Sequence, residues 1–192
     1  MTIDYKKCIH CGSRKVLGIV YGYPSSALAQ AEKDGKVILG GCEVSAGAPH
    51  YHCKDCGHEW NKIQAIDYAY RKIKTICAYV GGHRGPNYDV EIDLVKHQFS
   101  WRGDKNGRKL PAKLQEPITQ YSPEQLIDNI KTLNILNWDR KHMNYRALDG
   151  TQWSMIIERD GKTIKKYGSN AYPRTWGDFC KFVQSVTGKK FS

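Results

Sequence analysis

Hydrophobic and polar residues alternate most clearly between residues 88 and 95. Apolar side chains occupy every second position of this segment, and carboxylates occupy most of the positions between them. The two sets are Val90, Ile92 and Leu94 on one side and Asp89, Glu91 and Asp93 on the other. Because successive side chains of a strand point to opposite faces of a sheet, this period of two predicts a β-strand with one buried face.

Further strands are predicted where β-branched and aromatic residues cluster between turn residues. Residues 72–79 form one such run, and two glycines at positions 81 and 82 close it. Residues 151–158 and 162–167 form two more, separated by an Asp-Gly pair at positions 160 and 161. Asp-Gly is typical of a tight turn with positive φ angles, so these two runs are predicted to form a β-hairpin.

Two helices are predicted from apolar residues that recur every three to four positions. The first begins at Ser122, where Pro123 and Gln125 complete the pattern of a capping box. The second begins after Pro173 and ends at Gly188. Their apolar stripes are Leu126, Ile127, Ile130 and Leu133, and Trp176, Phe179, Cys180, Val183 and Val186. Both helices are therefore expected to pack on the apolar face of the sheet.

The first third of the chain contains shorter elements. Residues 16–21 and 36–39 are rich in β-forming residues and predict two strands. Between them, residues 27–33 predict a short helix capped by one of the two preceding serines. Residues 63–72 are interpreted as a connector to the second part of the chain.

Four cysteines form two Cys-x-x-Cys-Gly motifs, Cys8 with Cys11 and Cys53 with Cys56. Two intervening residues let one tight turn present both sulfurs to a single ion, and two such turns complete a tetrahedral shell. The glycine after each pair allows a positive φ angle, which brings backbone N–H groups close to the thiolates. The motifs predict a site for Zn²⁺. The alternatives are iron in a rubredoxin-like site, reduced cysteines without a metal, and two local disulfides. Because a closed shell leaves no position for a reactive water, the metal is expected to be structural.

These motifs resemble those of the zinc-ribbon family over residues 5–62. The resemblance implies a small sheet that holds one zinc ion at its end. The chain departs from the family pattern in the long insertion between the two motifs, whose cost in loop-closure entropy is small. Four further side chains near the motifs leave open whether one of them replaces a cysteine ligand. They are Cys42, His10, His52 and His58.

The second part of the chain resembles a poorly characterised bacterial α+β domain, mainly in residues 148–153 and 168–173. No activity follows from that resemblance. The combined prediction is an α+β protein with a Cys₄ zinc ribbon and inserted short helix at residues 1–62. A connector at 63–72 then leads to a mostly antiparallel sheet with two helices on one face at 73–192.

Positive charge is concentrated in this second part. The 192 residues carry a formal net charge of +11. Residues 1–62 hold 8 Lys and Arg against 6 Asp and Glu, whereas residues 63–192 hold 22 against 13, a net charge of +9. Such an excess favours a polyanionic partner, either nucleic acid or an acidic protein surface. The candidate contact residues are Arg102, Lys105, Arg108, Lys109, Arg140, Lys141, Lys165 and Lys166. Tyrosines among them, including Tyr145, offer rings on which bases can stack.

An enzymatic alternative rests on the carboxylates Asp89, Glu91 and Asp93, which share one face of a predicted strand. They are candidates for a metal-dependent nuclease or phosphoryl-transfer centre. The alternation assigns that face to solvent, however, where water and lysines relieve the repulsion between carboxylates. Cys77 and Cys180 fall on predicted apolar faces and are expected to be core residues rather than nucleophiles.

The sequence therefore predicts a non-enzymatic binding module with a structural zinc ion. Besides the enzymatic alternative, an interaction or immunity-type protein of bacterial defence remains open by analogy alone. The chain has no apolar run of the ~20 residues that cross a bilayer and no secretory signal, so a cytoplasmic location is expected.

Overall fold

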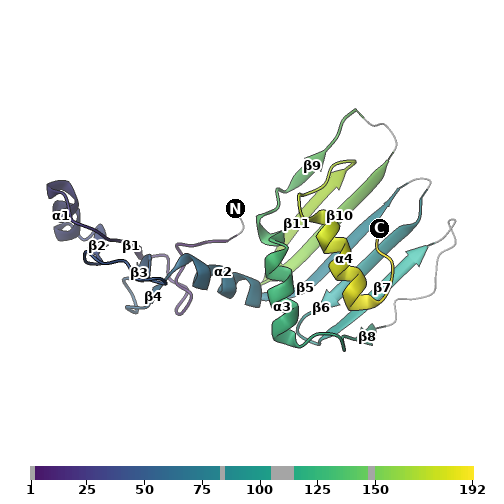
Figure 1. Ribbon diagram of the computed structural model, residues 1–192, viewed down its shortest axis with the longest axis horizontal. Helices are drawn as coiled ribbons and strands as arrows, with labels where there is room; N and C mark the ends of the chain where they lie inside the picture. Colours follow the sequence, from purple (N-terminus) through teal and green to yellow (C-terminus); the bar gives the residue numbers. More distant parts are fainter. Residues whose placement is uncertain (1–2, 83–84, 105–114, 147–149) are drawn as a thin grey trace. The chain divides into compact units, whose positions relative to one another are not determined.

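A computed structural model describes residues 3–82, 85–104, 115–146 and 150–192. The chain forms two compact units, residues 3–69 and 70–192, and each unit has its own sheet (Figure 1). The boundary between the units lies in the last turn of helix α2, Lys62–Arg71. Helices and mixed sheets confirm the α+β class. In the described part of the chain, none of the helices combines the length and the apolar character that a membrane crossing requires.

The first unit contains a four-stranded sheet in the order β2-β1-β3-β4. Its strands are β1 Val16–Val20, β2 Val37–Leu39, β3 Tyr51–Cys53 and β4 Glu59–Trp60. Helix α1, Ser26–Lys33, connects β1 to β2, and such a crossover returns the chain in the same direction, so these strands pair in parallel. Cys53 at the end of β3 lies opposite Val16 at the start of β1. This pairing brings the two cysteine motifs to the same end of the sheet.

The second unit contains a seven-stranded sheet in the order β8-β7-β6-β5-β10-β11-β9. Its strands are β5 Ile73–Gly82, β6 Asn87–Asp93, β7 Gln98–Asp104, β8 Gln115–Pro117, β9 Lys141–Met143, β10 Thr151–Arg159 and β11 Lys162–Ser169. Neighbouring strands pair antiparallel, except that β9 pairs parallel with β11. The sheet is therefore mixed but mostly antiparallel.

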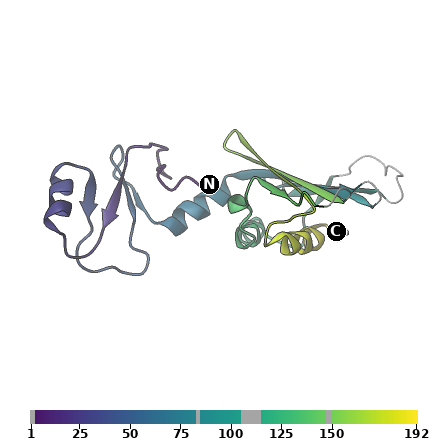
Figure 2. The same cartoon turned by 90° about the horizontal axis from the view of Figure 1, so that it is seen from above.

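Helices α3, Pro123–Thr132, and α4, Trp176–Thr187, cover one face of this sheet (Figure 2). A 3₁₀ turn, Ile135–Asn137, follows α3. The core beneath the helices is aromatic, with ring contacts among Trp138, Trp153, Trp176, Phe179 and Phe191. We call the opposite side of the sheet the open face, because no helix in the described part of this unit covers it (Figure 2).

Local signals in the sequence act as predicted. The Ser122 side chain accepts a hydrogen bond from the Gln125 N–H, and the Gln125 side chain accepts one from the Ser122 N–H, which completes the capping box. Asp160 and Gly161 have φ angles of 46° and 68° and form the turn of the β10–β11 hairpin. Gly188 ends α4 with a φ angle of 65°. These confirmed features depend on only a few neighbouring residues.

The segment 63–72, interpreted as a connector, is helical over most of its length, and the boundary between the two units lies within it. Buried side chains recur at helical spacing within it, at Ala65, Ala69 and Tyr70. The Tyr70 hydroxyl also accepts a hydrogen bond of 3.2 Å from the Leu136 N–H. The helix thus buries a stripe of apolar side chains. The many polar residues of the segment hide this pattern in the sequence.

The prediction that Cys77 lies on the apolar face of its strand is wrong. Ile76 and Ala78 are the buried residues there, and Cys77 lies on the open face opposite Glu91. The cause is an irregularity near the start of β5, where the register with β10 shifts between Glu158 and Arg159. The shift moves every later residue of β5 to the face opposite the predicted one.

The polar, glycine-containing composition of residues 102–109 predicts a basic loop, and the start of this segment differs from that prediction. Arg102 and Asp104 belong to strand β7. Residues 105–109 lie outside the described residues.

Candidate metal centre and candidate nucleic-acid interface

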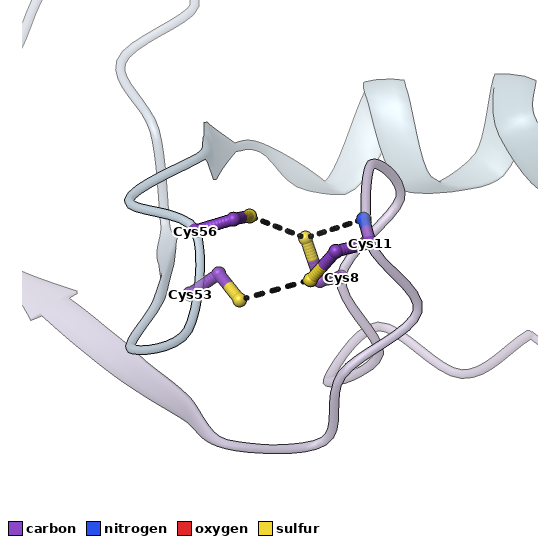
Figure 3. A group of neighbouring side chains, drawn as sticks. All are labelled: Cys8, Cys11, Cys53 and Cys56. Atoms are coloured by element: carbon purple, nitrogen blue, oxygen red, sulfur yellow. Dashed lines mark hydrogen bonds between the residues drawn. The ribbon is translucent and has the colours of Figure 1, made fainter.

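The four cysteines predicted as metal ligands lie together, with their sulfur atoms within 4.8 Å of one another (Figure 3). The Sγ atoms of Cys8 and Cys56 are 3.7 Å apart, and those of Cys11 and Cys53 are 3.5 Å apart. A tetrahedral zinc ion with Zn–S bonds of about 2.3 Å requires sulfurs about 3.8 Å apart, whereas a disulfide requires about 2.05 Å. The cluster therefore fits a four-coordinate metal ion and no disulfide.

Each motif folds as a tight turn that aims its two sulfurs in one direction. The Gly12 N–H donates to the Cys8 carbonyl at 3.0 Å, and the Gly57 N–H donates to the Cys53 carbonyl at 2.9 Å. Both glycines have positive φ angles, 76° and 72°, which side chains disfavour. The Cys11 N–H points at the Cys8 sulfur from 3.5 Å. Both turns thus have the conformation that the sequence predicts.

One carboxylate joins the two turns. Asp55, in the second motif, accepts a 2.6 Å hydrogen bond from Ser13 Oγ and forms a 3.2 Å ion pair with Lys15 Nζ. The hydrogen bonds from Ser13 and Lys15 lower the pKa of Asp55, which therefore stays charged at neutral pH. This contact holds the turns in register on the side away from the buried core.

The thiols differ in acidity because of their surroundings. Burial raises the pKa of Cys53, but the N–H groups of Cys56 and Asp55 outweigh it and lower that pKa to about 7. The His58 N–H lowers the pKa of Cys56, but desolvation and the neighbouring thiols raise it to about 12. The Cys53 thiol therefore loses its proton readily, whereas the neighbouring thiols oppose the ionisation of Cys56. Four thiolates at this spacing require a cation, and its binding releases protons.

Other side chains near the cluster pack around it. Buried Cys8, Cys53, Trp60 and Ala65 form the core of this region. Trp60 Nε1 donates to the Tyr5 carbonyl at 3.1 Å, which ties the chain before the first motif to the strand after the second. The remaining candidates, Cys42, His10, His52 and His58, do not belong to the cluster of ligand atoms.

The three carboxylates of β6 do not converge. Asp89 accepts hydrogen bonds from Arg102 Nε and Nη2 at 3.2 and 2.6 Å. Asp93 Oδ1 accepts from the N–H groups of Val95 and Lys96 at 3.0 and 2.8 Å. Among the described residues, the four cysteines are the one group of three or more side chains arranged to hold a metal. The geometry therefore gives no support to a metal-dependent nuclease centre on this strand.

Lys166 is excluded as a phosphate contact, because this residue is only 2% exposed. Its Nζ donates to the Leu136 carbonyl at 3.2 Å and to the Trp138 carbonyl. Neighbouring residues of a strand point to opposite faces, so Lys165 and Lys166 cannot both reach solvent on the open face. The inclusion of Lys166 is therefore wrong. The alternation of side chains along β11 is enough to exclude it.

Burial lowers the pKa of Lys166 to about 8. Between pH 8 and the ordinary lysine pKa of about 10.4, the unfolded chain holds a proton that the folded chain has lost, so stability rises with pH. We expect the wild type to gain up to about 3 kcal/mol relative to Lys166→Met across this window, measured by urea unfolding at several pH values. A constant difference between the two proteins would show that the folded ammonium keeps its proton.

The other described cations of the set lie at the surface. Lys141 of β9 is opposite Tyr167 of β11, and its Nζ is 5.5 Å from the centroid of the Tyr145 ring. A hydrogen bond to Tyr145 raises the pKa of Lys141. Tyr145 and Tyr167 are 75% and 42% exposed, and Lys165 lies on the same side of β11 as Tyr167. We call Lys141, Tyr145, Lys165 and Tyr167 the β9–β11 patch. Arg140 is exposed at its edge.

The remaining candidates lie elsewhere. Arg102 is on β7, paired with Asp89. Lys105, Arg108 and Lys109 lie outside the described residues.

A hollow of about 310 Å³ adjoins the β9–β11 patch. The side chains that line it on the open face are Tyr79, Met143, Gln152, Ser154, Tyr167 and Ser169. Sequence reasoning did not single out Tyr79 or Ser154. The alternation along β10 places Ser154 on the solvent side, but only the strand order shows that Tyr79 lies beside it.

Comparisons with protein-family models and with curated proteins give no match to this chain. The proposals below therefore depend on the geometry and chemistry of the chain itself.

Proposed function

We propose that this protein is a non-enzymatic nucleic-acid-binding protein whose first unit is stabilised by a structural zinc ion. The observation that carries the binding function is the β9–β11 patch, where exposed cations and tyrosines lie together on the open face of the sheet. The structural role of the metal is supported separately by the cysteine cluster.

Zinc fits the cluster better than ions that prefer oxygen ligands do. A set of four sulfurs is typical of structural zinc sites, and hard ions such as Mg²⁺ and Ca²⁺ prefer oxygen ligands. Four protein ligands fill a tetrahedral shell, which leaves no position where a water is activated. Iron takes the same ligands in rubredoxin-like sites, so metal analysis of the purified protein must distinguish the two.

Nucleic acid fits the β9–β11 patch better than an acidic protein does. An acidic protein surface supplies carboxylates for the cations, whereas a single-stranded nucleic acid supplies both phosphates for the cations and flat bases for the tyrosine rings. Tyr145 and Tyr167 are exposed beside cations, and such rings stack on bases while the cations contact phosphates. The net charge of +9 over residues 63–192 adds a general attraction for a polyanion.

The test is binding of a 12-nucleotide single-stranded oligonucleotide to the full-length protein over a range of salt concentrations. Neutralised phosphates release counterions, so affinity is expected to fall steeply as salt rises, with a slope of about 0.7 per contact. Lys141→Glu combined with Lys165→Glu should reduce this slope by about 1.4 and weaken binding at low salt at least tenfold.

The matched control is Lys181→Glu combined with Lys190→Glu. Lys181 lies on α4, Lys190 follows that helix, and both are exposed. The control makes the same change in net charge but leaves the β9–β11 patch intact. Equal losses in the two double variants would mean that charge alone drives binding. Absence of binding at low salt would rule out the nucleic-acid function.

A further inference from the structure

A single row of side chains crosses the open face of the second sheet. From β7 to β9, it consists of Arg102, Asp89, Tyr79, Ser154, Tyr167 and Lys141. Ser154 is the smallest of these side chains and lies between the two tyrosines. Neighbouring strands are about 4.8 Å apart, so the backbones of Tyr79 and Tyr167 are separated by about 10 Å. The row therefore contains a slot with aromatic walls and a small polar floor.

The slot has room for one flat ring. A ring packed between two others needs about 3.5–4.0 Å on each side, or roughly 7–8 Å in total. The hollow of about 310 Å³ is at the small end of the range for ligand-binding clefts, which is ~300–1,000 Å³. One heteroaromatic ring and part of an attached sugar match this space better than a larger ligand does.

The Tyr79 wall is held in place. Its hydroxyl donates a 2.7 Å hydrogen bond to Asn87 Oδ1, and the pair lies over Gly81. A Cβ atom at Gly81 would lie 2.0 Å from Asn87 Oδ1 and 2.7 Å from the Tyr79 hydroxyl, so only glycine leaves room for this contact. The second wall, Tyr167, is 42% exposed. A base can therefore reach the slot from solvent.

Polar groups and charges around the slot also suit a nucleotide. Gln152 and Ser169 form the next pair of the β10–β11 ladder that lies on the open face, and amide and hydroxyl groups bind the edges of unpaired bases. Lys141 lies one strand beyond Tyr167. On the other side, Asp89 is paired with Arg102, which reduces its repulsion of an anion. These charges favour a phosphate near Lys141.

We propose that this slot binds one base of a single-stranded nucleic acid, stacked between Tyr79 and Tyr167 above Ser154, with its phosphate toward Lys141. The proposal rests on the proposed function and gives it a substrate class. A base in a duplex is already stacked and paired, so the slot selects unpaired nucleotides. The same chemistry would admit a free mononucleotide.

The experiment compares three single-stranded chains of 12 nucleotides, namely DNA, RNA and an abasic DNA with the same phosphates. Binding to the full-length protein is followed by fluorescence anisotropy. Ser154→Leu fills the floor of the slot. Thr163→Leu makes a similar change on the open face of the same hairpin, opposite Glu158 and away from the slot. Adenosine 5′-monophosphate, followed by NMR, tests the mononucleotide.

We expect the wild type to bind at least one base-containing chain roughly tenfold or more tightly than the abasic chain, because a stacked base adds affinity that phosphates do not. Ser154→Leu should abolish this preference with little change in binding of the abasic chain. Thr163→Leu should retain it. Tyr167→Phe, which keeps the ring, should also retain most of it.

The two proposals fail in different ways. Equal, salt-dependent affinity for all three chains would overturn the base slot and leave the proposed function in place. If no chain binds at low salt, the proposed function is wrong. In that case, the mononucleotide still tests the slot. If adenosine 5′-monophosphate shifts resonances of the wild type but not of Ser154→Leu, the slot is supported. If it shifts none in the wild type, the slot is overturned.

Discussion

Removal of the metal is expected to unfold residues 3–69 and to leave the sheet of residues 70–192 folded. The described part of the first unit buries few apolar side chains, namely Ile3, Cys8, Ile19, Cys53, Trp60, Ala65 and Ala69. Two of these, Cys8 and Cys53, belong to the cysteine cluster that could hold the metal. A structural zinc contributes on the order of 10 kcal/mol to folding, which is comparable with the whole stability of a typical domain, about 5–15 kcal/mol. Without the ion, the small core cannot offset the entropy lost on folding.

The second unit has its own core of aromatic and aliphatic side chains beneath α3 and α4, so it does not depend on the metal. Circular dichroism and limited proteolysis, with and without a strong chelator, measure the two responses. Cys8→Ser should reproduce the effect of the chelator. Cys42→Ser, an exposed cysteine outside the cluster, is the matched control. A first unit that stays protected from protease after verified loss of metal would contradict a structural role.

The features predicted best from the sequence are those decided within a few residues. The capping box at Ser122, the Asp160–Gly161 turn and the two cysteine turns each depend on contacts that close over two to five positions. Their conformations are favoured by steric limits on φ and by hydrogen bonds between near neighbours. No knowledge of the rest of the fold is needed to predict them.

Features decided by strand register were harder to predict. The alternation in the sequence predicts the wrong face for Cys77, because one irregularity near the start of β5 reverses the alternation after it. Composition treats Lys165 and Lys166 alike and so predicts both at the surface, although neighbouring side chains of a strand point to opposite faces. In both cases the residue type was less informative than its position in the ladder.

The proposed base slot could not be predicted from the sequence at all. Tyr79 and Tyr167 are far apart along the chain, and they become neighbours only because β10 pairs with both β5 and β11. The strand order follows from burial of the whole apolar face, a global property of the chain. The sequence does not predict helix α2 for a related reason, since its buried stripe is defined only by packing against other segments.

The largest expected effect of a single substitution in the second unit is that of Trp153→Ala. Trp153 is 1% exposed, and its ring lies 4.7 Å from that of Trp176 and 6.0 Å from that of Trp138, measured between centroids. Its Nε1 donates a 2.8 Å hydrogen bond to the Ala171 carbonyl. Truncation removes these contacts and leaves a cavity in a rigid aromatic core. We expect a loss of about 3–5 kcal/mol in the free energy of unfolding.

Two further variants separate the causes of this loss in urea unfolding. Trp153→Phe keeps most of the ring volume but leaves the Ala171 carbonyl without its donor, so a loss of about 1–2 kcal/mol is expected. Trp101→Ala removes the same kind of side chain from a partly exposed position on β7 and should cost less than Trp153→Ala. If Trp153→Ala costs no more than Trp101→Ala, the aromatic cluster is not the main source of stability in this unit. The core would then have to depend on the aliphatic residues of β5, β6 and α4 instead.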